Sequence, residues 1–287
     1  MARRSRRETA MTDSAQGAFA RALARPEAEL DLGRAALLIA RAEYPHLDVE
    51  HYLRRLDALA ESIRGEVAME AEPRRRVGVL SRFLFLSEGF RGNAEHYFDP
   101  RNSFLNEVLD RKLGIPITLS TVYLEVARRL YLPITGVGFP GHFLVKYVLS
   151  DGEILIDPFH RGAILTQADC HRRLKEMTDG SVTLQPEHLR SVTKRQILAR
   201  LLTNLKQIYL RARNFPKALR TLDLLLLANP DEAAEVRDRG LLRFQAGRLG
   251  DALRDMERYL TMAPKAEDAD TIREHLAGVR RRMAAMN

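Results

Sequence analysis

Apolar residues recur at helical spacing through the first hundred residues of the chain. Residues 30–45 follow this spacing behind Asp31, a residue type that caps helix N-termini. Residues 48–64 repeat the pattern behind Asp48. Two further periodic stretches lie on either side, at 15–25 and 73–90. We therefore expect an N-terminal region that is all-helical.

The pattern changes in the middle of the chain. Residues 104–113 and 117–132 still have a helical period, and Gly114 and Pro116 separate them. After Pro133 the period shifts from 3.6 to 2, and the sequence Ser-Asp-Gly marks a hairpin turn. Three strands are predicted, at 134–139, 142–149 and 152–157. The middle region is therefore expected to be α+β, with helices packed on an antiparallel sheet.

From about residue 196 the chain is helical again and contains an internal repeat. Ala218 aligns with Ala252, and Pro230 with Pro264, at an offset of 34 residues. Three apolar pairs keep the same register: Leu210 with Phe244, Phe215 with Leu249, and Leu219 with Leu253. This offset is the tetratricopeptide period, in which the alanine lets two helices approach and the proline ends the second one.

These patterns divide the chain into three regions. Residues 1–27 form a basic tail and a short helix, 28–190 an α+β domain, and 196–287 a tetratricopeptide segment with two 34-residue units and a capping helix. Lys206 departs from the repeat consensus, because glycine is usual at that position. So small an array either binds a protein partner or packs within the chain. The leucine-rich stretch 222–230 favours packing, since it would otherwise expose its side chains.

Composition and charge limit the classes of function. With 45% hydrophobic residues the chain is not disordered, and its single cysteine, Cys170, excludes a disulfide framework and a cysteine-rich zinc site. We expect no metal and no cofactor. No stretch reaches the roughly 18 apolar residues of a membrane helix, so a cytoplasmic protein without membrane contact is predicted.

The net charge of +8 is concentrated at the two ends. Four arginines lie in the first ten residues, and three more at 280–282. Solvated tails explain this distribution, although it also allows a nucleic-acid partner. Met11 is an alternative start, in which case residues 1–10 would not belong to the natural protein.

A polar segment at 93–103 is one candidate for a binding site. Asn93, Tyr97, Asp99 and Asn102 could line the mouth of a cleft. The same residue types are common in turns and helix caps, and we favour that interpretation. In it, Asn102 or Ser103 caps the helix that follows.

His142 and Asp157 carry the most specific candidate chemistry. His142 follows a Pro-Gly pair, and Asp157 ends the last predicted strand. If the hairpin loop has four residues, 149–152, Asp157 lies opposite Leu144, so that its side chain and that of His142 share one face and meet diagonally. A two-residue turn would place Asp157 opposite Lys146, too far from His142.

The stretch NSFLNEVLDRKLGIPITLSTVYLEVARRLYLPITGVGFPGHFLVKY, followed by ILIDPF, closely resembles the SirB-type proteins. These are bacterial proteins with a transglutaminase-like domain followed by tetratricopeptide repeats, and the resemblance extends from about Glu29 to Met283. It implies a transglutaminase- or papain-like core, in which a cysteine at the start of a buried helix is paired with a histidine and an aspartate on strands. His142 and Asp157 occupy the last two of these positions.

The nucleophilic cysteine of such a triad is missing, because none lies between Leu113 and Val122, around the helix start expected at Pro116 to Ser120. Thr118, Ser120 and Thr121 are the hydroxyl side chains there. We interpret them as caps or buried structural groups rather than nucleophiles, and His142 with Asp157 as a structural pair. Cys170 follows both strands and is interpreted as a small buried hydrophobe. Because the SirB-type family lacks the cysteine, the resemblance favours a role without transglutaminase catalysis.

Three hypotheses of function follow. The favoured one is a non-catalytic, protein-binding or regulatory module, in which a degenerate His-Asp cleft is joined to tetratricopeptide repeats. The second is a hydrolase or acyltransferase that uses Ser120 or Thr118 with His142 and Asp157. The third is a basic RNA- or ribosome-associated factor, which rests on the charge alone.

Overall fold

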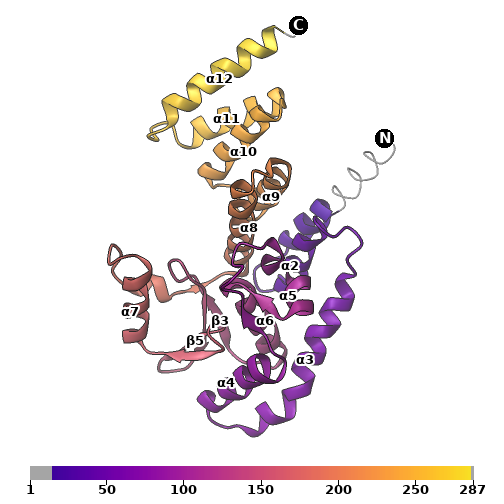
Figure 1. Cartoon of the computed structure of the whole chain (residues 1–287), viewed down its shortest axis with the longest axis vertical. Coiled ribbons are helices and arrows are strands. Elements are labelled where there is room, and N and C mark those ends of the chain that lie inside the picture. The colour runs from indigo at the N-terminus through magenta and orange to yellow at the C-terminus, as the bar shows by residue number, and fades with distance from the viewer. Residues whose placement is uncertain (1–14, 286–287) are drawn as a thin grey trace. The chain divides into compact units, whose positions relative to one another are not determined.

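The computed structural model describes residues 15–285 of the 287-residue chain. Two compact units make up the structure, the first ending at Leu201 and the second beginning at Leu202 (Figure 1). The basic tail predicted at residues 1–10 lies outside the described residues. Within the described part of the chain, no helix combines the length and the apolar character needed to cross a membrane.

The first unit begins with the expected helical region. A helix over residues 15–23 is followed by α2 (Leu32–Arg41), α3 (Val49–Met69) and α4 (Pro73–Arg82), which continues as a π-helical turn, Phe83–Ser87. The predicted caps are confirmed. Asp31 accepts a hydrogen bond from the backbone N–H of Arg34 at 2.9 Å, and Asp48 from that of His51 at 3.0 Å.

Helix α6 (Pro116–Arg129) lies at the centre of the first unit. All of its residues from Pro116 to Ala127 are buried, because it packs against α2, α3 and α5 (Leu105–Arg111) as well as two strands of the sheet. The core thus surrounds α6, although the helix also buries four polar residues, Thr118, Ser120, Thr121 and Glu125. Any group at its N-terminus is therefore held in a rigid, enclosed setting.

The cap predicted for α5 is wrong. Its N-cap is Phe104, which makes no side-chain cap, whereas Asn102 and Ser103 directly precede it, at the end of a 3₁₀ helix, Pro100–Ser103. The amide of Asn102 instead donates to the carbonyl oxygens of His96 and Tyr97, at 2.7 and 3.3 Å. The side chain of Asn102 therefore binds the carbonyls of the preceding loop and is not available to cap the helix.

A five-stranded antiparallel sheet completes the first unit, with the order β6-β5-β4-β3-β7. Its strands are β3 (Ile134–Val137), β4 (Leu144–Val148), β5 (Glu153–Asp157), β6 (Ala163–Leu165) and β7 (Ser191–Val192). A separate parallel pair joins β1 (Arg91–Gly92) to β2 (Leu113–Gly114). Helix α7 (Gln167–Met177) follows β6.

The register of the hairpin is the one that the four-residue loop requires. Val148 pairs with Glu153, so residues 149–152 form the loop. One expectation is corrected, because β4 begins at Leu144 and His142 lies in the turn before it. Pro140 cannot donate a ladder hydrogen bond, and Gly141 has a left-handed φ of +69°, so neither continues a strand.

The second unit is all-helical. Helix α8 (Lys194–Arg211) runs into it from the first unit, followed by α9 (Phe215–Ala228), α10 (Ala233–Gln245), α11 (Leu249–Met262) and α12 (Ala269–Ala284). The bounds of α9 and α11 differ by the predicted offset of 34, and Ala218 and Ala252 are fully buried. The expected fold class, an α+β domain followed by tetratricopeptide helices, is confirmed.

Lys206, where the repeat consensus has glycine, is buried and paired. Its ammonium lies 2.6 Å from Glu235 and 3.1 Å from Asp238, both on α10. The two carboxylates neutralise a charge that would otherwise be costly to bury. The departure from the consensus therefore links α8 to α10 within the second unit.

Candidate functional site

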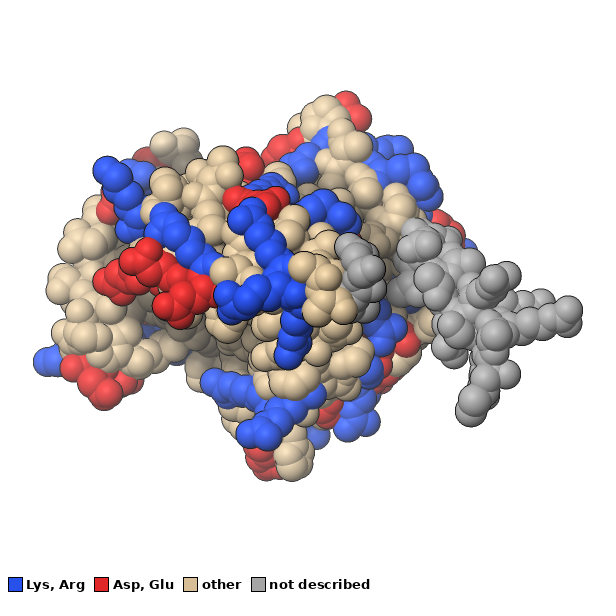
Figure 2. Space-filling model, turned by 90° about the horizontal axis from the view of Figure 1, so that it is seen from above, with Lys and Arg blue, Asp and Glu red and all other residues tan. Residues whose placement is uncertain are grey.

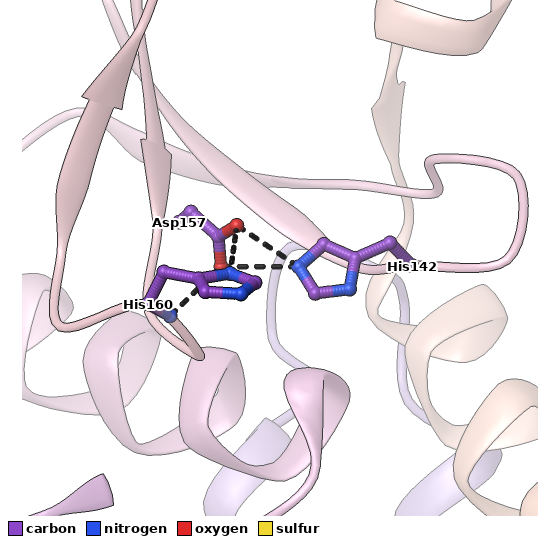
Figure 3. Close-up of side chains that lie close together, drawn as sticks. All are labelled: His142, Asp157 and His160. Atoms are coloured by element: carbon purple, nitrogen blue, oxygen red, sulfur yellow. Dashed lines mark hydrogen bonds and ion pairs between the residues drawn. The ribbon is translucent and has the colours of Figure 1, made fainter. Parts of the chain in front are cut away.

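His142 and Asp157 are hydrogen-bonded to each other, although they lie fifteen residues apart in the sequence. Nε2 of His142 lies 3.0 Å from Oδ1 and 3.1 Å from Oδ2 of Asp157 (Figure 3). The carboxylate can only accept, so Nε2 carries the proton and donates it. Nδ1 of His142 points away from Asp157 and is the nitrogen on which a proton could be exchanged.

The turn that carries His142 is fixed by the backbone and by a partly buried arginine. The N–H of His142 donates to the carbonyl of Phe139 at 3.1 Å. Arg200, on α8, donates from Nη2 to the carbonyls of Phe139 and His142, at 3.0 and 2.7 Å. These contacts hold the imidazole at the end of the sheet through backbone atoms, so they leave the ring nitrogens available for other partners.

Asp157 is a fully buried carboxylate at the end of β5. Its Oδ1 also accepts the backbone N–H groups of Phe159 and His160, at 3.0 and 3.2 Å. Burial alone would raise the pKa of Asp157, but the hydrogen bonds from His142 and His160 outweigh it and hold the pKa well below its usual value. Asp157 is therefore ionised throughout the physiological pH range.

Two partners of Asp157 escaped the sequence analysis. Nδ1 of His160 lies 2.8 Å from Oδ2, and the guanidinium of Arg173, on α7, contacts the same oxygen. The side chain of His160 is 54% exposed and that of Arg173 is 25% exposed, so both join the buried carboxylate to the surface. His160 could have been found from its position three residues after Asp157 in a tight turn. Nothing in the sequence marked Arg173.

A cavity of about 260 Å³ adjoins this cluster. Its polar side is formed by His142, His160, Arg173 and Glu176. Apolar side chains form the rest, namely Phe139, Leu144, Leu165, Cys170 and Met177. Its size suits a side chain or a small molecule.

Cys170 lies in the wall of this cavity but is fully buried. It packs in a cluster with Val137, Leu155 and Leu174, among other apolar residues. Burial raises the pKa of its thiol, which keeps the thiol protonated and a poor nucleophile. The structure thus places Cys170 in the hydrophobic core on α7, away from the start of α6.

The first residue of α6 is Pro116, and the helix carries no cysteine. The hydroxyl of Thr118 accepts the backbone N–H of Ile115 at 3.0 Å and donates to the carbonyl of Asn102 at 2.7 Å. Ser120 is fully buried, and among the described residues its hydroxyl has no hydrogen-bond partner. Neither hydroxyl is bonded to His142.

The polar segment 93–103 reaches His142 only through one aromatic ring. Tyr97 packs edge-to-face on Phe159, with 6.4 Å between ring centroids, and Phe159 packs in the same way on His142 at 5.9 Å. A Cβ on Gly92 would lie 2.5 Å from the ring of Phe159, so only glycine fits beneath it. Phe159 therefore separates the segment from the imidazole.

The other three polar residues of the segment are engaged locally. Asn93 is buried and donates to Asn102 at 3.1 Å. Asp99 accepts the backbone N–H of Arg101 at 2.9 Å and pairs with the side chain of the same arginine. None of Asn93, Tyr97, Asp99 and Asn102 lines the cavity beside His142. Their role in a cleft remains a prediction.

The fold and the buried His-Asp pair define a transglutaminase-like domain followed by tetratricopeptide repeats. The model of the transglutaminase-like superfamily matches residues 50–203, and that of the tetratricopeptide repeat matches residues 205–277. The chain belongs to the UPF0162 family, whose members are similar over most of their length. No solved structure matches the chain.

Three relatives illustrate this similarity. The UPF0162 protein of Xylella fastidiosa (strain Temecula1) is 38% identical over 250 residues, covering 86% of this chain and 89% of the relative. That of Vibrio cholerae is 31% identical, with 85% and 90% covered. The UPF0162 protein YchA of Escherichia coli (strain K12) is 30% identical, with 83% and 88% covered.

Proposed function

We propose that this chain is a non-catalytic, cytoplasmic, protein-binding or regulatory module of the SirB type. In it, a degenerate transglutaminase-like cleft is combined with tetratricopeptide repeats that bind a protein partner or dock within the chain. The observation that supports this most directly is the start of α6. There, α6 begins with Pro116 and holds no cysteine, Thr118 caps the helix, and among the described residues neither Thr118 nor Ser120 is hydrogen-bonded to His142.

Catalysis of acyl transfer requires a nucleophile within hydrogen-bond reach of its base. His142 has the orienting carboxylate, Asp157, and a second nitrogen that points away from it. Without a nucleophile, such a dyad can still donate or accept a hydrogen bond and so orient a bound group. It is thus suited to hold a polar group of a bound segment against the cavity.

A fluorophosphonate probe tests this proposal on the full-length protein. We expect no labelling of the wild type under conditions that label a serine hydrolase completely. Labelling at Ser120 that disappears in both Ser120→Ala and His142→Ala would overturn the proposal. Labelling that persists in His142→Ala would be non-specific, since the base would not be needed.

One observation favours the hydrolase alternative. The buried hydroxyl of Ser120 has no partner among the described residues, and an unpaired buried hydroxyl is uncommon unless it meets a ligand or a water molecule. The probe experiment decides between the two proposals, because only the alternative requires a reactive Ser120.

A groove of about 990 Å³ favours the nucleic-acid alternative. Its cationic lining comprises Arg21, Arg25, Arg34, Arg41, Arg128 and Lys194. Acidic residues also line it, among them Glu50, which pairs with Arg34 at 2.6 Å. On the face shown in Figure 2, basic groups outnumber acidic ones but the two are interspersed.

Salt dependence tests this alternative. If the protein binds RNA, its affinity should fall steeply with salt and fall further when residues 1–10 and 280–287 are deleted. Arg21→Glu combined with Arg25→Glu should weaken the same binding if the groove takes part. An affinity without a salt slope would exclude it.

A further inference from the structure

Three side chains of the His142 cluster present their donor atoms at the spacing of metal ligands. Nε2 of His142 lies 3.1 Å from Oδ2 of Asp157, and Nδ1 of His160 lies 2.8 Å from the same oxygen. All three groups place one donor atom within 4.8 Å of the others. Neighbouring ligands at about 2.1 Å from a transition metal are roughly 3 Å apart, which is the separation found here.

The position between Asp157 and His160 already receives a positive charge. Nη1 of Arg173 contacts Oδ2 of Asp157 and lies 3.2 Å from Nδ1 of His160. His160 donates to Asp157 when Nδ1 carries its proton; when the proton lies on Nε2 instead, Nδ1 accepts from the guanidinium, which only donates. In that tautomer, two lone pairs 2.8 Å apart face a single cationic group. Arg173 thus occupies the place that a metal ion would take.

The carboxylate is oriented for one oxygen to bind. Oδ1 of Asp157 accepts the N–H groups of Phe159 and His160, which leaves Oδ2 for a cation. Hydrogen bonds of this kind fix metal ligands in known sites. The imidazole of His142 is held by its own turn, as described above, and needs only to move its proton from Nε2 to Nδ1 to become a ligand.

Arg173 has room to leave this position. Its side chain is partly exposed and lines the 260 Å³ cavity together with both histidines. Glu176 lies one helical turn further along α7 and lines the same cavity, so it can accept the displaced guanidinium. The cavity also leaves coordination positions open to a small ligand.

We propose that His142 Nε2, Asp157 Oδ2 and His160 Nδ1 bind a divalent first-row transition metal, such as Zn²⁺ or Fe²⁺, in competition with Arg173. Two imidazoles and one carboxylate on one face are a donor set that these metals prefer over Mg²⁺ and Ca²⁺. The site differs from the expectation that no metal binds. It does not depend on the proposed partner-binding function.

Titration calorimetry of the tag-free, full-length protein with ZnCl₂ tests the proposal, with Co²⁺ absorption as a second readout. We expect one Zn²⁺ per chain and visible Co²⁺ bands of a site with fewer than six ligands. His160→Ala should weaken Zn²⁺ binding at least 100-fold; because this side chain is half exposed, the fold should survive. Arg173→Gln should tighten binding at least tenfold.

His171→Ala is the matched control, because this exposed histidine lies on α7 outside the cluster. It should leave the affinity unchanged. The proposal is overturned if the wild type does not bind Zn²⁺ at 1:1 stoichiometry, or if His160→Ala binds it as tightly as the wild type does. Unchanged affinity in Arg173→Gln would overturn the competition between the metal and the guanidinium.

Discussion

Each unit of this protein contains a buried aspartate that gathers cationic or polar donors. In the first unit, Asp157 accepts from His142, His160 and Arg173 beside a cavity. In the second unit, Asp255, on α11, is 3% exposed and accepts from Arg239 at 2.8 and 2.9 Å and from Arg243 at 2.7 Å. The two carboxylates are equally buried, but their donors differ.

Arginine keeps its charge at any pH at which a protein is folded, whereas histidine can lose it. Burial by itself would lower the pKa of Arg239, but its hydrogen bonds to Asp255 and the charge of Asp223 raise it. The arginines that pair with Asp255 in the second unit therefore keep their charge at any pH at which the protein is folded. The Asp157 cluster has imidazoles that can change protonation and tautomer, as a binding or catalytic site requires.

The largest effect should follow from breaking the fixed network. Within residues 15–285, Asp255→Asn leaves Arg239 and Arg243 with Asp223 as their one carboxylate partner, at 3.0 Å from each. Uncompensated buried charge costs about 3–5 kcal/mol of unfolding free energy. Urea unfolding followed by circular dichroism measures this, with Asp251 as the control. Its partners Arg248 and Arg254 are 47% and 70% exposed, so Asp251→Asn should cost below about 1 kcal/mol. Equal losses in the two variants would refute the role of burial.

Asp157→Asn should destabilise the protein less, by about 2–3 kcal/mol. The amide oxygen can still accept the backbone N–H groups of Phe159 and His160. The guanidinium of Arg173 loses its carboxylate partner, but its side chain reaches solvent. Asp151→Asn, in the exposed hairpin loop, provides the control in the same urea series. A loss greater than that of Asp255→Asn would reverse the comparison.

Acid should act on Asp157 through its lowered pKa. Because the pKa in the folded state lies below the unfolded value of about 3.9, the ionised carboxylate stabilises the protein fully above about pH 5. This contribution of roughly 2–3 kcal/mol is lost as the pH falls toward the folded pKa. Wild type and Asp157→Asn should therefore converge in stability between pH 5 and pH 2. A constant difference over that range would mean that Asp157 is not ionised.

Much of this architecture could be predicted from the pattern of the sequence. The helix caps Asp31 and Asp48 and the 34-residue repeat follow from local chemistry and periodicity, which the chain displays directly. The hairpin register does not, because the sequence allows either a two-residue or a four-residue loop. The register alone brought Asp157 opposite Leu144 and so within reach of His142.

The remaining features depend on contacts between distant segments. Arg173 is brought to Asp157 by the packing of α7, and Asn102 turns to the carbonyls of its own loop instead of capping α5. The start of β4 was also missed, since a turn geometry set by Gly141 decides it. The spacing of apolar residues does not predict these features, because each depends on which of several hydrogen-bond partners a side chain or backbone group contacts in the folded chain.

The smallest differences in unfolding free energy are expected between two hydroxyl groups of α6, those of Thr118 and Ser120. As with the two aspartates, the hydrogen-bond partners decide the size of the effect. Thr118→Val leaves the buried N–H of Ile115 and the carbonyl of Asn102 without this partner, and should cost about 1–2 kcal/mol. Thr118→Ser keeps the hydroxyl and should recover most of the loss. Ser120→Ala removes a hydroxyl that has no partner among the described residues, so stability should stay within about 0.5 kcal/mol or rise. A loss of more than about 1 kcal/mol in Ser120→Ala would show that this hydroxyl has a hydrogen-bond partner. His142 would then be the first candidate for that partner.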